Sequence, residues 1–353
     1  MKKVLVAGLA VGIAAANSVS AAATIDGSAA ASDAGLKLAT TWDKTFAQSD
    51  KVEHRKVTFK NRYGITLAAD LYKPKDAKGK LPAIAVSGPF GAVKEQASGL
   101  YAQTMAERGF LTIAFDPSYT GESGGEPRNV ASPDINTEDF SAAVDYLSTS
   151  PEVSPDHIGL IGICGFGGMA VNAASMDTRI KATVASTMYD MSRVNARGYF
   201  DAMDADARYA LREKLNAQRT KDYASGTYAP APGLPEKLKG DEPQFVKDYW
   251  EYYKTPRGFH ARSINSNGAW NMTSSLSFMT MPLLTYASEI RSAVLLIHGE
   301  KAHSRYFSED TFNQLKGDNK ELLIIPGANH TDLYHKTDVI PFDKIEDFMK
   351  KNL

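Results

Sequence analysis

The single cysteine of the chain, Cys164, stands where an apolar run meets a cluster of glycines. Residues 158–163 have the composition of a buried strand, and Gly165, Gly167 and Gly168 follow the cysteine within four positions. Small residues let a sharp turn from strand to helix adopt strained dihedral angles and let the helix pack closely. A thiol on such a turn is held above the sheet, so Cys164 is the first candidate nucleophile.

Segment 158–168 resembles the nucleophile turn of the α/β-hydrolase superfamily, with cysteine in the place that serine usually holds, as in the dienelactone hydrolase branch. The resemblance covers residues 52–353. It implies a hydrolase of small esters, lactones or thioesters that works by nucleophilic acyl transfer. It also implies that a histidine after the last strand acts as the base, and His330 occupies that place.

The acid that would orient His330 departs from the family pattern. Relatives carry an aspartate in a Gly-x-x-Asp turn after the seventh strand, but here that turn is Gly299-Glu300-Lys301-Ala302. We therefore predict Glu300 as the acid, with Asp190 at the end of the sixth strand as the alternative. Asp332 is expected to cap its own loop.

The resemblance places the oxyanion hole in the loop Ser87–Ala92, with the backbone amide of Phe90 as one donor and the amide of Gly165 as the other. Residues 115–125 match the Asp-x-x-x-x-Gly-x-Ser loop that recurs in this superfamily. We expect that loop to support the site from behind.

Two registers of the glycine cluster remain open. In one, Cys164 is the nucleophile of Gly162-Ile163-Cys164-Gly165-Phe166; in the other, Phe166 occupies the nucleophile position. Phenylalanine has no nucleophilic atom, so the second register predicts a catalytically eroded hydrolase fold that binds a ligand or a partner. A redox-sensing thiol is a third hypothesis, disfavoured because the chain has no second cysteine to resolve an oxidised sulfur.

The elements that must position these residues alternate between strands and helices. A hairpin is predicted from residues 57–60 and 65–71, followed by strands at 81–87, 111–115, 158–163, 180–186, 293–298 and 321–325. Helices are predicted at 96–108, 137–147, 167–174, 309–315 and 340–353. This order predicts an α/β fold with a mostly parallel central sheet, helices on both faces, and ligands at the carboxyl ends of the strands.

Residues 191–287 interrupt the alternation and are helical, loop-like and rich in aromatic side chains. We expect them to form a cap inserted after the sixth strand, within a hydrolase domain of residues 51–353. Their aromatic side chains favour an apolar or aromatic small-molecule substrate. No cofactor is expected, and no zinc-binding motif is present in the sequence.

The first residues read as a secretory signal. Lys2 and Lys3 precede an apolar run over residues 4–16 and a small-residue cleavage pattern at residues 19–21. We predict a signal peptide at 1–21 and a flexible arm at 22–50, and therefore a periplasmic or secreted protein that has left the membrane after cleavage. The formal net charge of −1 is too small for capture of nucleic acid, so no nucleic-acid partner is expected.

Overall fold

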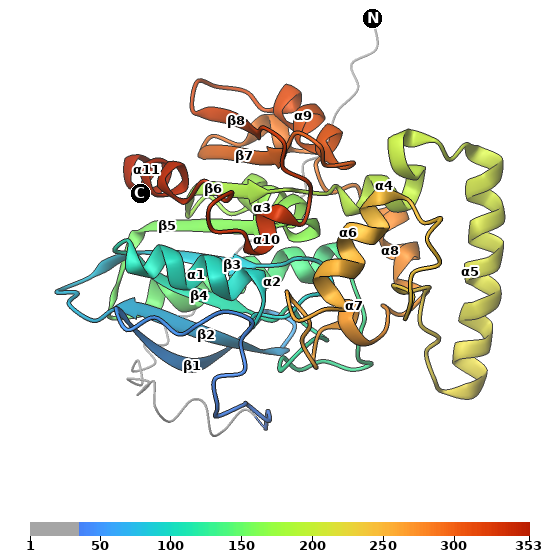
Figure 1. Ribbon diagram of the computed structural model, residues 1–353, viewed down its shortest axis with the longest axis horizontal. Coiled ribbons are helices and arrows are strands. Elements are labelled where there is room, and N and C mark those ends of the chain that lie inside the picture. The colour runs from blue at the N-terminus through green and yellow to red at the C-terminus, as the bar shows by residue number, and fades with distance from the viewer. Residues whose placement is uncertain (1–34) are drawn as a thin grey trace, which may run out of the picture.

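The computed structural model describes residues 35–353 (Figure 1). The predicted signal peptide at 1–21, and residues 22–34 of the predicted arm, lie outside the described residues. Residues 35–50 form no helix or strand but lie against the domain, where Lys44 Nζ is 2.7 Å from the buried carboxylate of Asp70.

Eight strands form one sheet in the order β1-β2-β4-β3-β5-β6-β7-β8. β1 and β2 form the predicted antiparallel hairpin, β2 is also antiparallel to β4, and the remaining pairs are parallel. The strands are β1 (Val52–Lys60), β2 (Thr66–Pro74), β3 (Leu81–Ser87), β4 (Leu111–Phe115), β5 (Val153–Ile163), β6 (Ile180–Ser186), β7 (Ala293–Gly299) and β8 (Lys320–Ile325).

Helices cover both faces of the sheet. α1 (Ala97–Glu107) and α11 (Phe342–Asn352) pack on one face, and α2 (Pro133–Thr149) and α3 (Gly165–Met176) pack on the other. The remaining helices of the sheet domain are α9 (Arg305–Gln314) and the short α10 (Asp332–His335). Buried apolar residues form one cluster on each face, so the parallel strands at the centre are buried from both sides.

The start of α2 shows how local sequence sets these elements. Ser132 is the N-cap and its hydroxyl accepts a hydrogen bond from the amide of Ile135, while Pro133 opens the first turn, where its missing amide costs nothing. The sequence analysis predicted that this helix begins at residue 137, four residues later than Pro133. The prediction followed the apolar pattern, whereas the capping residues that start the helix lie before that pattern.

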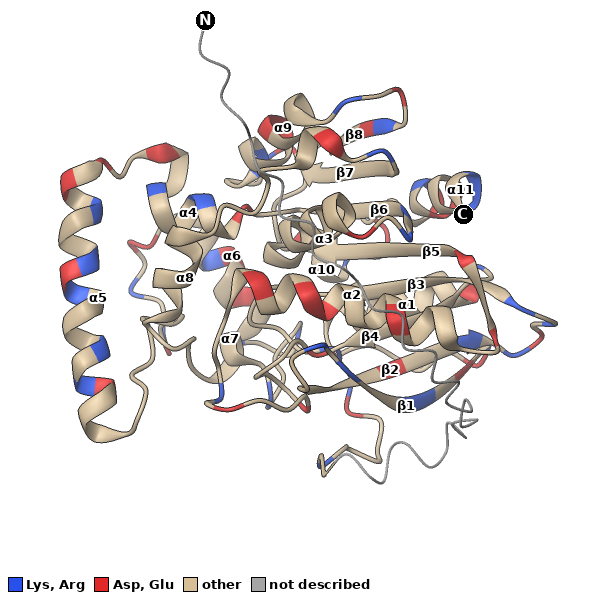
Figure 2. Cartoon of the chain, turned by 180° about the vertical axis from the view of Figure 1, so that it is seen from behind, with Lys and Arg blue, Asp and Glu red and all other residues tan. Residues whose placement is uncertain are grey.

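The predicted cap lies between β6 and β7 and contains α4 (Met191–Arg197), α5 (Ala205–Ser225), α6 (Gln244–Tyr253), α7 (Ile264–Asn267) and α8 (Ser274–Thr280). Figure 1 shows α5 standing at the outer edge, with α6 and α7 nearer the sheet. The α/β architecture with helices on both faces and a helical insertion after the sixth strand is confirmed. Figure 2 shows both acidic and basic residues along α5.

Candidate active site

The turn between β5 and α3 has a strained backbone at Cys164. Its φ is 56° and its ψ is −126°, a conformation that residues other than glycine rarely adopt. A Cβ added to Gly162 would lie 2.2 Å from the carbonyl oxygen of Phe166, and one added to Gly165 would lie 2.8 Å from the Cβ of Phe90. The glycines therefore allow the close approach that the sequence pattern predicted.

Phe166 lies inside the core and not on the turn. Its side chain is fully buried, with its ring centroid 6.1 Å from that of Phe140 and 6.4 Å from that of Phe90. Cys164 therefore occupies the strained turn position, and the register that gave this position to Phe166 is not the one in the structure. The physical reason is that α3 begins at Gly165, which turns Phe166 under the helix.

The thiol of Cys164 faces the two backbone amides predicted for the oxyanion hole. Burial raises the pKa of Cys164, and the neighbouring Tyr334 hydroxyl and the amides of Gly165 and Phe90 oppose that rise. Only 6% of the cysteine is exposed. The resting group is thus a buried neutral thiol whose sulfur is already close to donors that could stabilise negative charge.

The loop that carries Phe90 is fixed from two sides. Gly88 has a φ of +97°, and a Cβ there would lie 2.3 Å from the carbonyl oxygen of Ile163, so the loop packs directly against the end of β5. From the cap, the Asn265 side chain donates a 2.8 Å hydrogen bond to the carbonyl oxygen of Phe90. Sequence reasoning did not single out Asn265, because its contact depends on how the cap folds back.

His330 is buried beside this turn. Its Nε2 is 2.9 Å from the hydroxyl of Tyr334, which is also close enough to Cys164 to influence the pKa of the thiol. Its Nδ1 is 2.6 Å from Ser304 Oγ and 2.9 Å from Thr187 Oγ1. Burial, with smaller contributions from His303 and His298, holds the pKa of His330 well below its ordinary value, so the ring is neutral.

The structure does not bring Glu300 to this ring. Its amide donates to the carbonyl oxygen of Ile325, and its carboxylate accepts a 2.8 Å hydrogen bond from the amide of Gly327. The loop after β7 therefore does not turn back toward His330 as predicted. The backbone at Gly299 is packed so closely that a Cβ there would lie 2.4 Å from the carbonyl oxygen of Ala328.

The alternative acid is also placed elsewhere. Asp190 is the N-cap of α4, where its side chain accepts a 2.9 Å hydrogen bond from the amide of Arg193. Asp332 accepts a 2.9 Å hydrogen bond from the amide of Asn329, which is the loop-capping contact predicted for it.

Tyr334, Ser304 and Thr187 were not anticipated from the sequence. Tyr334 follows His330 by four residues, a spacing that puts two side chains on one side of a helical turn, and this was the one available signal. Ser304 and Thr187 carry ordinary hydroxyls after β7 and β6, and only the parallel sheet brings them to one edge.

Aromatic side chains of the cap cover the site. From α6, the ring centroid of Tyr249 lies 5.3 Å from that of His330, and the ring of Tyr252 lies 5.1 Å from that of Tyr334. Tyr189 contributes a hydroxyl 3.1 Å from that of Tyr249 and a short hydrogen bond to His303. The cap side of the site, next to His330 and Tyr334, is therefore lined by aromatic rings that carry hydroxyl groups.

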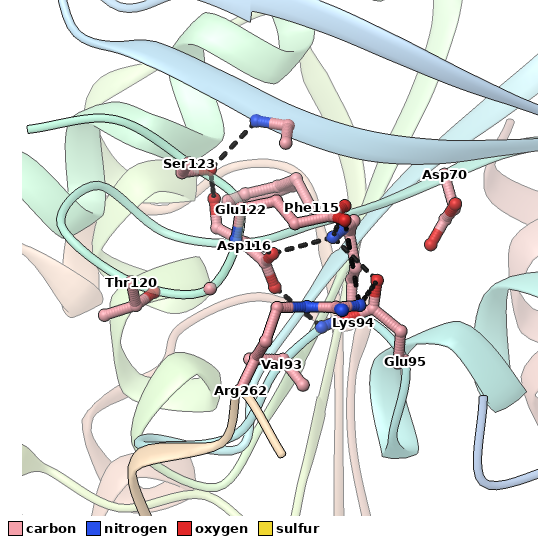
Figure 3. Close-up of polar contacts among 12 residues, drawn as sticks. Asp70, Val93, Lys94, Glu95, Phe115, Asp116, Thr120, Glu122, Ser123 and Arg262 are labelled. Carbon is pink, nitrogen blue, oxygen red and sulfur yellow. Dashed lines mark hydrogen bonds and ion pairs between the residues drawn. The ribbon is translucent and has the colours of Figure 1, made fainter. Parts of the chain in front are cut away.

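A buried charge cluster lies behind the oxyanion loop (Figure 3). Lys94 Nζ lies 2.7 Å from Asp116, 2.6 Å from Glu122 and 2.8 Å from Glu95, and Arg262 of the cap lies 2.9 Å from Glu95. Burial lowers the pKa of Lys94, but the surrounding carboxylates outweigh that effect and hold the pKa well above its usual range. The cluster thus ties the segment after Phe90 to both the sheet and the cap.

Asp116 begins the Asp-x-x-x-x-Gly-x-Ser loop identified in the sequence. Gly121 has a φ of +55°, and a Cβ there would lie 2.2 Å from the Asp116 carboxylate. Ser123 donates a 2.6 Å hydrogen bond to the carbonyl oxygen of Asp116 and accepts one of 2.8 Å from the amide of Ala68. The loop lies behind the site and supports it.

Among residues 35–353, no group of histidine, cysteine, aspartate or glutamate side chains is arranged to hold a metal ion. Over the same residues, no helix is both long and apolar enough to cross a membrane.

The sequence profile of the X-Pro dipeptidyl-peptidase (S15) family matches residues 63–332. The chain belongs to this family. It is similar to PA2218 of Pseudomonas aeruginosa, with 62% identity over 336 residues that cover 95% of this chain and 90% of the relative. The crystal structure of PA2218 superposes with a TM-score of 0.88 at 63% identity, covering 90% of this chain and 99% of that one.

More distant matches agree on the fold. The α/β-hydrolase GrgF from Penicillium sp. sh18 superposes with a TM-score of 0.72 at 21% identity, covering 85% of this chain and 99% of that one. The thiohydrolase aneE of Aspergillus aculeatus is 31% identical over 186 residues, covering 53% of this chain and 56% of the relative. The α/β-hydrolase superfamily and a hydrolase character are confirmed, whereas none of these matches supports the narrower dienelactone hydrolase branch.

Proposed function

We propose that this protein hydrolyses small esters, lactones or thioesters by acyl transfer to Cys164. The observation that carries the proposal is the thiol on a strained turn, beside the closely packed residues Phe90 and Gly165, whose backbone amides oppose the rise in its pKa. Those amides lie where a carbonyl oxygen would gain negative charge during attack by the sulfur.

The contacts suggest the order of proton transfers. As the sulfur attacks the carbonyl carbon, the thiol proton passes to the Tyr334 oxygen and the Tyr334 proton passes to His330 Nε2, leaving a neutral tyrosine and an imidazolium. The imidazolium then protonates the leaving group, and a thioester to Cys164 remains. Water attacks that thioester with His330 again as the base, and the free thiol returns.

The relatives support this chemistry at a coarse level. Proteins named thiohydrolase and acyltransferase are among the matches. The aromatic rings of Tyr249 and Tyr189, which lie against His330, favour an apolar or aromatic acyl group, since such a group would pack on them. Peptide hydrolysis is the second candidate, because the family profile covers most of the chain.

The eroded-hydrolase hypothesis loses one of its two supports, because Phe166 is not on the turn. Its other support, the missing aspartate at Ala302, remains and is reinforced by the placement of Glu300. Ligand binding without catalysis is therefore the outcome that the experiment must separate from hydrolysis.

The test is hydrolysis of a panel of aryl esters, acyl thioesters and an X-Pro anilide by the wild type and by Cys164→Ala and His330→Ala. We expect ester or thioester turnover that both substitutions reduce at least 100-fold, and an intact-mass increase equal to the acyl group on wild-type protein only. Alkylation by iodoacetamide reports the same thiol, because it is the only one in the chain. Turnover that persists in Cys164→Ala, or a folded wild type without any turnover, would overturn the proposal.

Export to the periplasm or the medium is likewise proposed, on the strength of Lys2, Lys3 and the apolar run that follows them. Cell fractionation with N-terminal sequencing of the mature protein tests it. A new N-terminus near residue 22 is expected, and an intact Met1 in the cytoplasmic fraction would contradict export.

A further inference from the structure

The side of His330 that faces away from the thiol carries hydroxyl groups where a catalytic triad would carry a carboxylate. Ser304 Oγ lies 2.6 Å from His330 Nδ1 and 2.9 Å from His298 Nε2, and His298 Nδ1 lies 2.7 Å from Ser308 Oγ. All four of these residues are buried, with at most 1% of each exposed. The four side chains form a continuous chain of hydrogen bonds along the ends of β7 and β8.

The other groups facing His330 carry no negative charge. The rings within contact distance are Tyr189, Tyr249, Tyr334, His298 and His303. The nearest carboxylate in sequence, Asp332, is paired with Lys336 at 2.6 Å. Among the described residues, the hydrogen bonds of the imidazole go to hydroxyl groups alone.

The proposed proton path sets the direction of this hydrogen-bond chain. For His330 Nε2 to accept from Tyr334, Nδ1 must carry the ring proton and donate it to Ser304 Oγ at 2.6 Å, which is nearer than Thr187 Oγ1 at 2.9 Å. The Ser304 hydroxyl then donates to His298 Nε2, and His298 Nδ1–H donates to Ser308 Oγ. Each ring nitrogen of the two histidines has a partner, and each proton has one acceptor.

We propose that Ser304 and His298 take the place of the triad acid as positioning residues. They hold the tautomer of His330 in which Nδ1 carries the proton and Nε2 is unprotonated. The inference rests on the proposed function and deepens it. When Nε2 takes up the proton that leaves Cys164 by way of Tyr334, the Nδ1–H remains on His330 and its bond to Ser304 strengthens. No bond of Ser304 or His298 is broken, so the pair stabilises the imidazolium without itself changing charge.

The activity test compares Ser304→Ala, Ser304→Thr and His298→Gln with a matched control, Ser98→Ala, whose buried hydroxyl has no hydrogen-bond partner. With a short acyl thioester as probe, we expect kcat to fall at least tenfold in Ser304→Ala and His298→Gln with KM within threefold of wild type. Ser304→Thr, which keeps a hydroxyl, and Ser98→Ala should stay within threefold.

The pH profile separates positioning from simple structural support. Loss of the Ser304 acceptor destabilises the imidazolium, so the acid limb of kcat/KM should move to lower pH in Ser304→Ala and stay in place in Ser304→Thr. A folded Ser304→Ala with wild-type kcat and an unmoved limb would overturn the inference, and so would lost activity with an unmoved limb.

A third measurement does not depend on turnover. Two-bond ¹H–¹⁵N spectra of the wild-type histidine rings report the tautomer directly, and we expect His330 with its proton on Nδ1. A proton on Nε2 of His330 would contradict the inference even if the protein hydrolyses thioesters. An inactive wild type that shows the Nδ1–H tautomer would instead contradict the proposed function alone.

Discussion

Tyr334 is the residue on which the proposed proton path depends, because its hydroxyl is 2.9 Å from His330 Nε2 and is close enough to Cys164 to influence the pKa of the thiol. A tyrosine in this position is unusual for a group that must yield its proton, since burial raises its pKa well above the ordinary value. Tyr334 therefore acts by passing one proton while receiving another, and never as a free phenolate.

Replacement of Tyr334 by phenylalanine removes that bridge and keeps the ring. We expect kcat to fall about 10-fold to 100-fold, because the thiol then has no hydrogen-bonded route to the base. Steady-state kinetics with the acyl thioester measure the change. Tyr72→Phe is the control, since Tyr72 is fully buried and its hydroxyl has no partner. A Tyr334→Phe enzyme as fast as wild type would show that thiol and imidazole meet directly once substrate is bound.

At the scale of the element, the junction of β5 and α3 decides where the thiol stands. The φ of Cys164 is positive, and α3 begins at the next residue and passes close to β5. Only glycine at position 162 leaves room for this close approach. The same packing sends Phe166 into the core. The boundary between β5 and α3 therefore places Cys164 on the turn and keeps Phe166 off it.

The corresponding prediction is Gly162→Ala. Its Cβ would lie 2.2 Å from a backbone oxygen and 2.7 Å from the Cβ of Ala170, and neither can move without shifting α3. We expect a loss of about 2 kcal/mol or more in the free energy of unfolding, measured by urea denaturation. Gly268→Ala should change it by less than about 0.5 kcal/mol, because nothing lies within 4 Å of a Cβ there. Equal stabilities for the two variants would refute the packing explanation.

At the scale of the whole molecule, buried neutral histidines link stability to pH. Burial, the largest cause, lowers the pKa of His298 to about 3 and that of His330 well below 6.5. The unfolded chain therefore takes up protons on these rings below about pH 6.5 while the folded chain does not, so stability falls as the pH drops. Asp139 works in the opposite direction, since burial raises its pKa to about 6.

We expect the free energy of unfolding to fall between pH 6.5 and pH 5. His298 contributes at most about 2 kcal/mol to this loss. His330 and His303, whose pKa burial lowers to about 4, add to it, and Asp139 offsets part of it. Urea unfolding across this range measures it. The exposed His157 provides the control, because His157→Gln should leave the pH dependence unchanged while His298→Gln weakens it. Stability that rises on acidification would contradict the assignment of neutral rings.

Sequence alone determined the architecture and the position of the glycine-rich turn, and it left open whether Cys164 or Phe166 stands on that turn. The alternation of apolar runs predicted all eight strands and the cap after β6, and the glycines around Cys164 predicted the turn, because these signals are local and periodic.

The identity of the group that hydrogen-bonds His330 Nδ1 was decided only by the tertiary structure. Glu300, Ser304 and Thr187 all follow strands whose ends meet at one edge of the sheet, and sequence cannot tell which side chain points at the ring. Backbone contacts at Gly299 and Ile325 turn Glu300 away, and hydroxyls occupy the place that a carboxylate was expected to hold.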